Sequence, residues 1–288
     1  GVIANRVGSE RHAELVAEAL APLGIPLVGV LHRDADLVTP SRHLGLVPVA
    51  ERTAEARRTV ADLGARVGAA VDLDALLVLA SSAPSLTVPP WDPEAGVQHP
   101  VRIAVAGGRA FSFTYAENLE LLTGVGAEVV LIDPTADEAL PDGTDGLYLG
   151  GGFPEMHGDA LSANARLRRA VADFAAAGRP VLAECGGLLY LCRSLDGRPM
   201  CGVLDAEARL TDRLTLGYRT AEAAADSWYA SRGTAVRGHE FHHSTVTPAA
   251  GDPPAWRLRA ADDRPVGEDG FVRGGVHASY LHTHWAAN

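Results

Sequence analysis

A cysteine stands where a buried strand is expected to turn into a helix. Segment 180–183 is apolar, Cys185 follows it, and Gly186 and Gly187 open a run with helical spacing. A strand, a sharp turn and a helix form a nucleophile elbow, which holds the reactive side chain at the turn. The glycines let the backbone fold back without a Cβ clash, and the helix N-terminus is expected to lower the pKa of the thiol. A small buried cysteine on a core strand is the alternative interpretation.

A thiol nucleophile needs a base, and histidine is the side chain whose pKa lies in the working range. Six of the 11 histidines lie in the last fifty residues, at positions 239, 242, 243, 277, 282 and 284. The C-terminal run is strand-like, so His282 and His284 are predicted to point to the same face. One of them could therefore meet Cys185 across a cleft.

Acyl transfer also needs hydrogen-bond donors for the developing oxyanion, usually backbone N–H groups in a glycine-rich turn. Gly150, Gly151 and Gly152 directly follow the apolar segment 146–149. In a doubly wound sheet, the carboxyl end of that strand lies near the carboxyl end of the strand before Cys185. A phosphate-binding turn or an ordinary strand-to-helix turn is the alternative interpretation of the three glycines.

The composition indicates a soluble globular protein that is long enough for two domains. Of its 288 residues, 47% are hydrophobic and 21% are charged. The net charge of −11 argues against binding to nucleic acid or to an anionic membrane, and no apolar run predicts a membrane span. All 25 basic residues are arginine, which excludes a Gly-Lys-Ser/Thr phosphate loop and a Schiff-base lysine. The three unpaired cysteines favour a reducing, cytoplasmic compartment over a disulfide scaffold.

Three stretches with different patterns divide the chain. Residues 1–85 alternate between strand and helix patterns, which is typical of a parallel sheet covered by helices, and they show only two strands. This stretch is predicted to be the C-terminal part of a larger α/β domain whose beginning lies upstream. Residues 86–99 are rich in proline and serine and are predicted to be a linker. Residues 100–288 begin as a doubly wound α/β layer and become rich in strand patterns.

The expected elements can be given by their ranges. Strands are predicted at 2–4, 26–31, 101–106, 127–132, 146–149, 180–183, 214–219, 235–247 and 271–282, and helices at 10–23, 53–67, 73–79, 115–123 and 161–177.

Several runs occur together, in this order, in one enzyme family. They are Phe111-Ser-Phe-Thr-Tyr-Ala-Glu-Asn118, Gly146-Leu-Tyr-Leu-Gly-Gly-Gly-Phe-Pro-Glu155, Ala183-Glu-Cys-Gly-Gly-Leu-Leu-Tyr190, Leu216-Gly-Tyr-Arg219, Arg237-Gly-His-Glu-Phe-His242 and Ala278-Ser-Tyr-Leu-His282, with shorter matches at 5–10 and 44–48. Through them the chain resembles, over essentially its whole length, the C-terminal portion of cobyrinic or hydrogenobyrinic acid a,c-diamide synthases. The motifs are several and independent, which makes the resemblance highly specific.

The resemblance implies a two-domain fold. Residues 1–85 would end an ATP-dependent, P-loop synthetase domain of the dethiobiotin-synthetase type whose Walker A half is absent here. Residues 100–288 would be an α/β class I glutamine amidotransferase domain of the doubly wound type. Asn5 would lie where related synthetase domains contact the adenine base.

The resemblance also implies roles for residues of the second domain. Cys185 would be the glutaminase nucleophile and His282 its base. The oxyanion hole would combine the backbone N–H of Gly186 with that of Gly151 or Gly152.

Two further roles in this domain are less directly given by the family. Arg219 is a candidate for the glutamine carboxylate, because a guanidinium can bind it with two hydrogen bonds. Most class I glutaminases carry a glutamate two residues after the histidine, where this chain has His284. This branch of the family lacks that acid, so the residue that orients His282 is open, with Glu240 and His284 as candidates.

The reaction implied by the resemblance is glutamine-dependent amidation of the a and c acetate carboxylates of cobyrinic or hydrogenobyrinic acid, in vitamin B12 biosynthesis. This chain would carry the glutaminase half, which releases ammonia from L-glutamine through a cysteine thioester. ATP, Mg²⁺ and the corrinoid substrate would bind the N-terminal synthetase domain or chain. A homodimer is among the expected assemblies, and the presence of cobalt in the substrate is left open.

Three other functions compete with this one. His239, His242 and His243 could form a zinc, copper or nickel site, although the first two would lie on opposite faces of a strand and no metal is expected. The domain could be a catalytically inactive binding module, since the His-x-Glu acid is missing. It could also be a sister amidotransferase that acts on another corrinoid, such as a cobyric acid synthase, or on a cell-wall precursor. The run that begins at Phe111 favours the a,c-diamide enzyme.

Overall fold

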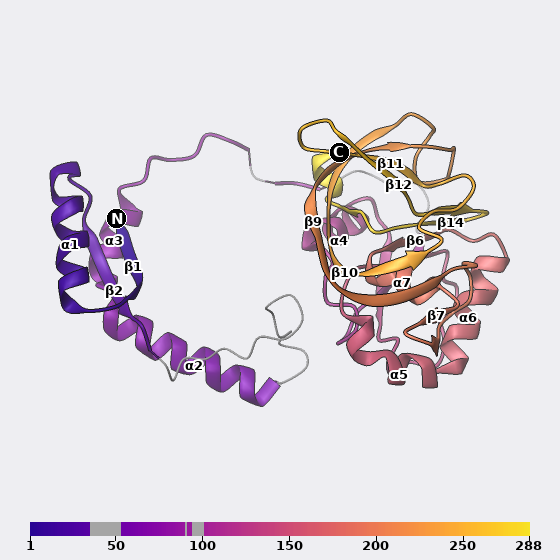
Figure 1. Cartoon of the computed structure of the whole chain (residues 1–288), viewed down its shortest axis with the longest axis horizontal. Coiled ribbons are helices and arrows are strands. Elements are labelled where there is room, and N and C mark those ends of the chain that lie inside the picture. Colours follow the sequence, from indigo (N-terminus) through magenta and orange to yellow (C-terminus); the bar gives the residue numbers. More distant parts are fainter. Residues whose placement is uncertain (35–52, 90, 94–100) are drawn as a thin grey trace. The chain divides into compact units, whose positions relative to one another are not determined.

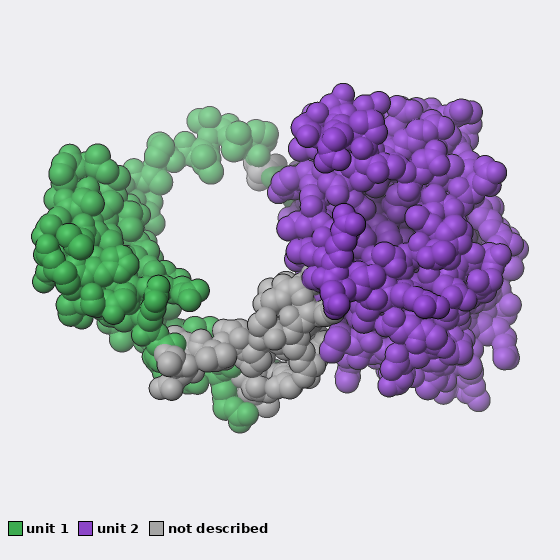
Figure 2. All heavy atoms as spheres, viewed as in Figure 1, with its two compact units in different colours: residues 1–91 green, residues 92–288 purple. Residues whose placement is uncertain are grey.

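The computed structural model describes residues 1–34, 53–89, 91–93 and 101–288, and only the backbone of 53–56. These residues form two compact units, Gly1–Trp91 and Asp92–Asn288 (Figures 1 and 2). The division between the units falls inside the predicted linker 86–99. Part of that linker and the whole motif at 44–48 lie outside the described residues.

The described residues of the first unit form a two-stranded parallel sheet, three α-helices and one short 3-10 helix. Its elements are β1 (Val2–Val7), α1 (Glu10–Leu20), η1 (Ala21–Leu23), β2 (Leu27–His32), α2 (Thr53–Ala70) and α3 (Leu73–Ser81). Ser9 caps α1 by accepting a hydrogen bond from the His12 N–H. The predicted helix 10–23 ends early, because its last turn tightens into η1 and closes at Gly24, whose φ is 64°.

The first unit has a small core. Val7, Val28 and Val71 are its buried hydrophobic residues among those that the structure describes. In contrast, Leu77 and Val78 of α3 are 65% and 70% exposed. Two parallel strands with so few buried side chains bury little apolar surface. That these residues close a larger synthetase domain stays a prediction.

A six-stranded sheet forms the centre of the second unit (Figure 1). Its order is β13-β14-β6-β5-β3-β4, and every neighbouring pair is parallel except β13 with β14. The strands are β3 (Arg102–Ala106), β4 (Glu128–Ile132), β5 (Gly146–Leu149), β6 (Val181–Glu184), β13 (Phe271–Arg273) and β14 (Val276–Ser279). The carboxyl ends of β5 and β6 are therefore neighbours, as the sequence predicted.

Helices cover both faces of this sheet, because alternate residues of each strand point to opposite sides. One face packs against α5 (Gly158–Ala163), α6 (Ala165–Ala176) and α7 (Gly186–Leu191). On the other face, Val105, Tyr148 and Leu182 pack near Leu119 of α4 (Ala116–Gly124). The predicted doubly wound layer is confirmed. The single helix expected at 161–177 is wrong, because Asn164 ends α5 and caps α6.

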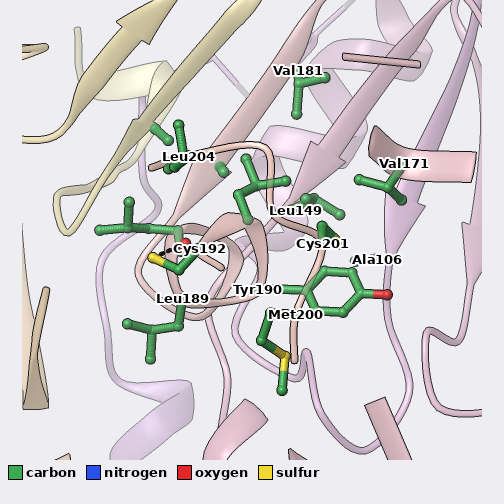
Figure 3. Packing of buried hydrophobic residues seen from close by; sticks show 14 of the residues in the cluster. Ala106, Leu149, Val171, Val181, Leu189, Tyr190, Cys192, Met200, Cys201 and Leu204 are labelled. Carbon is green, nitrogen blue, oxygen red and sulfur yellow. Dashed lines mark hydrogen bonds between the residues drawn. The ribbon is translucent and has the colours of Figure 1, made fainter. Parts of the chain in front are cut away.

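The packing around α7 makes a rigid support for the turn that precedes it. Leu189 and Tyr190 of α7 lie among Cys192, Met200 and Cys201 (Figure 3). The Cys192 thiol donates a hydrogen bond to the Leu188 carbonyl at 3.3 Å, and burial raises its pKa to about 12. Cys192 and Cys201 are therefore buried packing residues in this structure.

The second unit also contains a mostly antiparallel sheet with the strand order β12-β11-β9-β10-β15. In addition, β7 of this sheet pairs with β9, and β8 pairs with β7. Its strands are β7 (Ser194–Leu195), β8 (Arg198–Pro199), β9 (Glu207–Ala223), β10 (Ala235–Thr247), β11 (Trp256–Ala260), β12 (Pro265–Asp269) and β15 (His282–Thr283). The sequence predicted β10 in full and only 214–219 of β9, and it missed β11 and β12. The chain leaves the central sheet at Ser279 and enters the second sheet at His282, opposite His239.

Gly187 illustrates how closely the backbone packs after β6. A Cβ there would lie 2.1 Å from the Leu149 carbonyl oxygen. We expect Gly187→Ala to lower the free energy of unfolding of the second unit by roughly 1–3 kcal/mol, or to prevent its folding. Gly107→Ala is the matched control, because its nearest neighbour, the Ile132 carbonyl oxygen, would be 3.8 Å away. Urea denaturation followed by near-ultraviolet circular dichroism measures both, and equal midpoints would contradict this expectation.

Candidate active site

Cys185 stands at a strained turn between β6 and α7. Its φ of 47° and ψ of −97° lie in a region that side-chain-bearing residues rarely adopt. Its backbone N–H donates to the Ser279 carbonyl at 2.8 Å, and the residue is 6% exposed. Gly187 N–H donates to the Gly150 carbonyl at 3.0 Å, which ties the start of α7 to the glycine turn. This is the geometry of a nucleophile elbow.

The glycine turn after β5 contacts both the start of α7 and His282. A Cβ on Gly151 would lie 2.3 Å from Cε1 of His282, and a Cβ on Gly186 would lie 3.0 Å from the Gly152 nitrogen. Only residues without side chains let the imidazole ring and the helix start approach this turn. The residue after Cys185 and the ring of His282 therefore both lie against the turn Gly150–Gly152.

The hydrogen bonds of this turn narrow the choice of oxyanion donors. The Gly151 N–H donates to the Phe113 carbonyl at 3.0 Å, so it is committed and the predicted role for Gly151 is not supported. The Gly152 N–H has no hydrogen-bond acceptor in the part of the chain that the structure describes. The Gly186 N–H favours the thiolate form of Cys185. Gly152 and Gly186 remain as the candidate pair.

Burial sets the protonation of the candidate nucleophile and base. Burial, followed by the charge of Glu155, raises the pKa of the Cys185 thiol well above its usual range, despite the Gly186 N–H. Burial, with smaller effects of His239 and His242, lowers the pKa of His282 to about 3. Both groups are therefore neutral at pH 7, and His282 can accept a proton. The predicted lowering of the thiol pKa is wrong, because one short helix does not offset the removal of water.

Three of the six C-terminal histidines lie in two stacked ring pairs, of which only one joins two histidines. His239 stacks on His282 with ring centroids 4.9 Å apart and 12° between the planes, and its Nδ1 lies 3.4 Å from the Tyr115 hydroxyl. His242 stacks on Tyr280 instead, at 3.7 Å. No three metal-ligating side chains among the described residues lie where they could hold an ion. The alternative of a histidine metal site therefore has no geometric support here.

Arg219 and Glu240 bind each other, which changes the roles expected of both. Arg219 Nε donates to the Glu240 carboxylate, and both side chains are almost fully buried. Glu240 lies opposite Gly217 in the β9–β10 ladder, and a Cβ on Gly217 would collide with the guanidinium. The other partner of Glu240 within the described chain is His242, at 3.6 Å. Burial alone would raise the Glu240 pKa, but His242 and Arg219 hold it below its usual value.

Two sequence predictions are corrected by this ion pair. Glu240 does not orient His282, because its carboxylate is taken by Arg219 and because it points away from His239 and His282 across the strand. Arg219 is not a free cation for a glutamine carboxylate, because Glu240 already neutralises it.

The two other predicted residues, His284 and Asn5, have partners other than His282. His284 Nε2 is 3.6 Å from the Glu117 carboxylate, and its ring packs edge-on against Tyr115 at 4.8 Å. It therefore does not act as the orienting partner of His282 in this structure. Asn5 is exposed on β1 in the first unit, where its Oδ1 accepts a hydrogen bond from the Arg6 N–H at 2.8 Å. Its role toward a nucleotide stays a prediction.

Buried polar residues with no role predicted from the sequence surround the segment that carries His282. Glu184 accepts hydrogen bonds from Thr283, and Asp269 accepts one from the Tyr280 N–H. The side chain of Asn118 donates to the Thr283 carbonyl at 3.0 Å and accepts from the Trp285 N–H at 2.9 Å. A signal existed for Glu184, since it is a charged residue at the end of an otherwise apolar, buried strand.

Comparison with known proteins identifies the family. Residues 102–288 match the family model described as the CobB/CobQ-like glutamine amidotransferase domain. This chain belongs to that family. The resemblance inferred from the motifs is therefore confirmed, and the α/β class I amidotransferase fold of the second unit with it.

Curated relatives extend the match to the whole chain. The chain is 52% identical over 320 residues to the hydrogenobyrinate a,c-diamide synthase of Streptomyces coelicolor, in a match that covers 100% of this chain and 65% of that protein. It is 50% identical to the enzyme of the same name from Thermobifida fusca, with coverages of 99% and 63%. It is 45% identical to the cobyrinate a,c-diamide synthase of Gloeobacter violaceus, with coverages of 99% and 62%. The chain thus spans a little under two thirds of the length of these relatives.

A glutamine amidotransferase from Thermotoga maritima aligns with a TM-score of 0.44 and 15% identity, over 64% of this chain and 76% of that one. None of the described helices combines the length and the apolar character needed to cross a membrane.

The neutral state of Cys185 predicts how fast its thiol reacts. We expect iodoacetamide to alkylate it slowly at neutral pH and about tenfold faster for each pH unit as the pH rises toward 9, in step with the thiolate fraction. Mass spectrometry of the peptide that contains Cys185 measures the rate, with Cys185→Ala as the blank. A fast rate that does not change with pH would show a preformed thiolate–imidazolium pair and contradict the neutral one.

Glu184 and Asp269 predict how stability depends on pH. Burial raises their pKa values from 4.5 and 3.8 to about 7 and about 8, so the folded state binds their protons more tightly than the unfolded state. Their contribution is full at low pH and is lost as the pH rises through the raised values. His277 and His282, with pKa values lowered to about 4 and about 3, act in the opposite direction, but only below pH 6.5.

Between pH 6.5 and about 8 the two carboxyls therefore dominate among these four groups. We expect the free energy of unfolding to fall with rising pH, by up to about 1.4 kcal/mol per pH unit for each group. Urea denaturation across this range should show a flatter dependence in Glu184→Gln and Asp269→Asn. The slope should stay unchanged in Glu128→Gln, which removes a carboxylate from the surface strand β4. Stability that increases with pH in the wild type would refute this account.

Proposed function

We propose that the second unit of this chain hydrolyses L-glutamine to glutamate and ammonia through a thioester on Cys185. The observation that carries the proposal is the shared glycine turn. It receives the turn of Cys185 at Gly152 and the imidazole of His282 at Gly151. Membership of a glutamine amidotransferase family supports the choice of glutamine as the amide that is cleaved.

In the first half of the reaction, the sulfur attacks the carboxamide carbon of glutamine while His282 takes the thiol proton. The new oxyanion lies between the N–H groups of Gly152 and Gly186, and each such donor stabilises the transition state by about 3–4 kcal/mol. When the C–N bond breaks, His282 returns the proton to the nitrogen, which leaves as ammonia. The acyl group stays on Cys185 as a thioester.

In the second half, His282 removes a proton from water as the water oxygen attacks the thioester carbonyl. The same two N–H groups stabilise the second oxyanion. Breakdown releases glutamate, and the sulfur regains a proton from His282. Each half begins with a neutral imidazole, whose open ring nitrogen takes the proton, although its lowered pKa makes it a weaker base than a free imidazole.

For the whole protein, we propose that this ammonia amidates the a and c acetate carboxylates of hydrogenobyrinic or cobyrinic acid. The names of the relatives and their identities of 45–52% support this choice over a cobyric acid synthase. ATP and Mg²⁺ would activate each carboxylate in an N-terminal synthetase domain or chain, and Asn5 would contact the adenine. A phosphate-loop lysine would have to come from outside this sequence, which has none. We expect the protein to be cytoplasmic and to form a homodimer.

Glutaminase turnover of this chain tests the proposal. We expect Cys185→Ala to abolish glutamate release and His282→Ala to lower kcat about 10²–10⁴-fold, because the base is lost. Cys192→Ala and His12→Ala serve as controls, since the first removes a packing thiol and the second an exposed imidazole of the first unit. Equal background rates in the wild type and Cys185→Ala would contradict the proposal and favour an inactive binding module.

A further inference from the structure

We infer that two buried carboxyl groups, those of Glu184 and Asp269, position His282 by holding the main chain on each side of it. The inference rests on the proposed role of His282 as the base. It answers what replaces the acid that most class I glutaminases place two residues after the histidine. In this chain the orientation would come from the backbone of the segment and not from a carboxylate on the imidazole ring.

Glu184 holds the residue that follows the base. Its Oε1 accepts hydrogen bonds from the Thr283 N–H at 3.1 Å and from the Thr283 hydroxyl at 2.6 Å. Its Oε2 accepts from the Tyr148 hydroxyl at 2.8 Å. Glu184 itself is buried, so water cannot replace any of these partners.

Asp269 holds the residues that precede the base. Its Oδ2 accepts a hydrogen bond from the Tyr280 N–H at 3.0 Å, and the N–H groups of Leu281 and Gly270 also stabilise its charged form. Asp269 is buried as well. His282 therefore lies between Leu281 and Thr283, each of which donates a main-chain N–H toward a different buried carboxyl group.

The segment needs such partners because its sheet pairing is short. β15 consists of two residues, and its register with β10 joins only His282 to His239 and Thr283 to Gly238. Between Ser279 and His282 the chain crosses from one sheet to the other, so Tyr280 and Leu281 belong to no strand. The carboxyl groups supply hydrogen bonds where a ladder would otherwise supply them.

Glu184 also links the base to the nucleophile. It directly precedes Cys185, whose N–H is bound to the Ser279 carbonyl at the start of the same segment. The strand that ends in the sulfur and the segment that carries the imidazole are thus joined at two points. A displacement of about 1 Å at a reacting group can cost about 10²-fold in rate, so this connection bears directly on catalysis.

Kinetics and hydrogen exchange on the complete 288-residue chain test the inference together. We expect Glu184→Ala to lower kcat for glutamine by about 10²-fold with KM nearly unchanged, because the base is displaced and the substrate contacts are not. Glu184→Gln keeps a carbonyl acceptor for Thr283 and should recover about tenfold of that loss. Thr283→Val loses the hydroxyl but keeps the N–H, so its kcat should lie between the values of Glu184→Ala and the wild type. Asp269→Asn should also lower kcat, because it loosens Tyr280 and Leu281, which precede the base.

Exchange of the amides at 279–285, followed by mass spectrometry, reports the position of the segment independently of turnover. It should be faster in Glu184→Ala and Asp269→Asn than in the wild type, and unchanged in the surface control Glu128→Gln. A kcat that stays at the wild-type value, a rise in KM alone, or unchanged exchange in these variants overturns the inference. If Glu184→Ala does not fold, the kcat values and amide exchange of Glu184→Gln and Thr283→Val test the inference instead.

The same data separate this inference from the proposed function. If the wild type shows no glutaminase turnover, the proposed function fails, and exchange at 279–285 alone decides whether the carboxyl groups hold the segment. If the wild type is active and the variants keep both kcat and exchange, the proposed function stands and the inference fails.

Discussion

Close approach of backbone at three consecutive glycines is the constraint on which the second unit depends. The turn Gly150–Gly152 must admit an imidazole ring, the first residues of α7 and the strand-like run at Phe113. Any side chain on Gly151 would occupy the volume of the His282 ring. The central sheet fixes the position of this turn relative to Cys185, because β5 and β6 are parallel neighbours and end at the same edge. The strained backbone of Cys185 is tolerated because α7 is anchored in the core on its other side.

The second sheet supplies the other half of the site. Its long hairpin, β9 with β10, presents His239 to His282 on one face and encloses the Arg219–Glu240 pair on the other. Two charged side chains placed so deep are stable only because each neutralises the other and Gly217 leaves room for them. The charges of Arg219 and Glu240 therefore stabilise the sheet and do not face a substrate. The hydrogen-bond donors that the site can offer to a substrate are the backbone N–H groups of Gly152 and Gly186.

Much of the fold follows from the sequence, and the reasons are local. Short apolar runs located β5 and β6, and the cysteine and two glycines after the second run located the elbow. The break at Asn164 was missed, because an asparagine inside an amphipathic pattern is compatible with a helix until its capping bond is seen. β12 was missed because four of its five residues are exposed and give no alternation. β11 does alternate, with Trp256 and Leu258 buried and Arg257 and Arg259 exposed, and this strand signal was overlooked. Glu240 and Arg219 were assigned wrongly, because pairing across a ladder depends on register, which no spacing along one strand specifies.

The uncharged state of Cys185 and His282 has a consequence for the lifetime of the protein in an oxidising cell. Peroxides and electrophiles attack thiolates far faster than thiols, and sulfinic or sulfonic acids formed at a nucleophile end its activity. A sulfur that is buried and protonated between turnovers is protected from such damage. The same burial that makes the resting site slow to react therefore preserves it until a substrate carbonyl arrives to receive the sulfur.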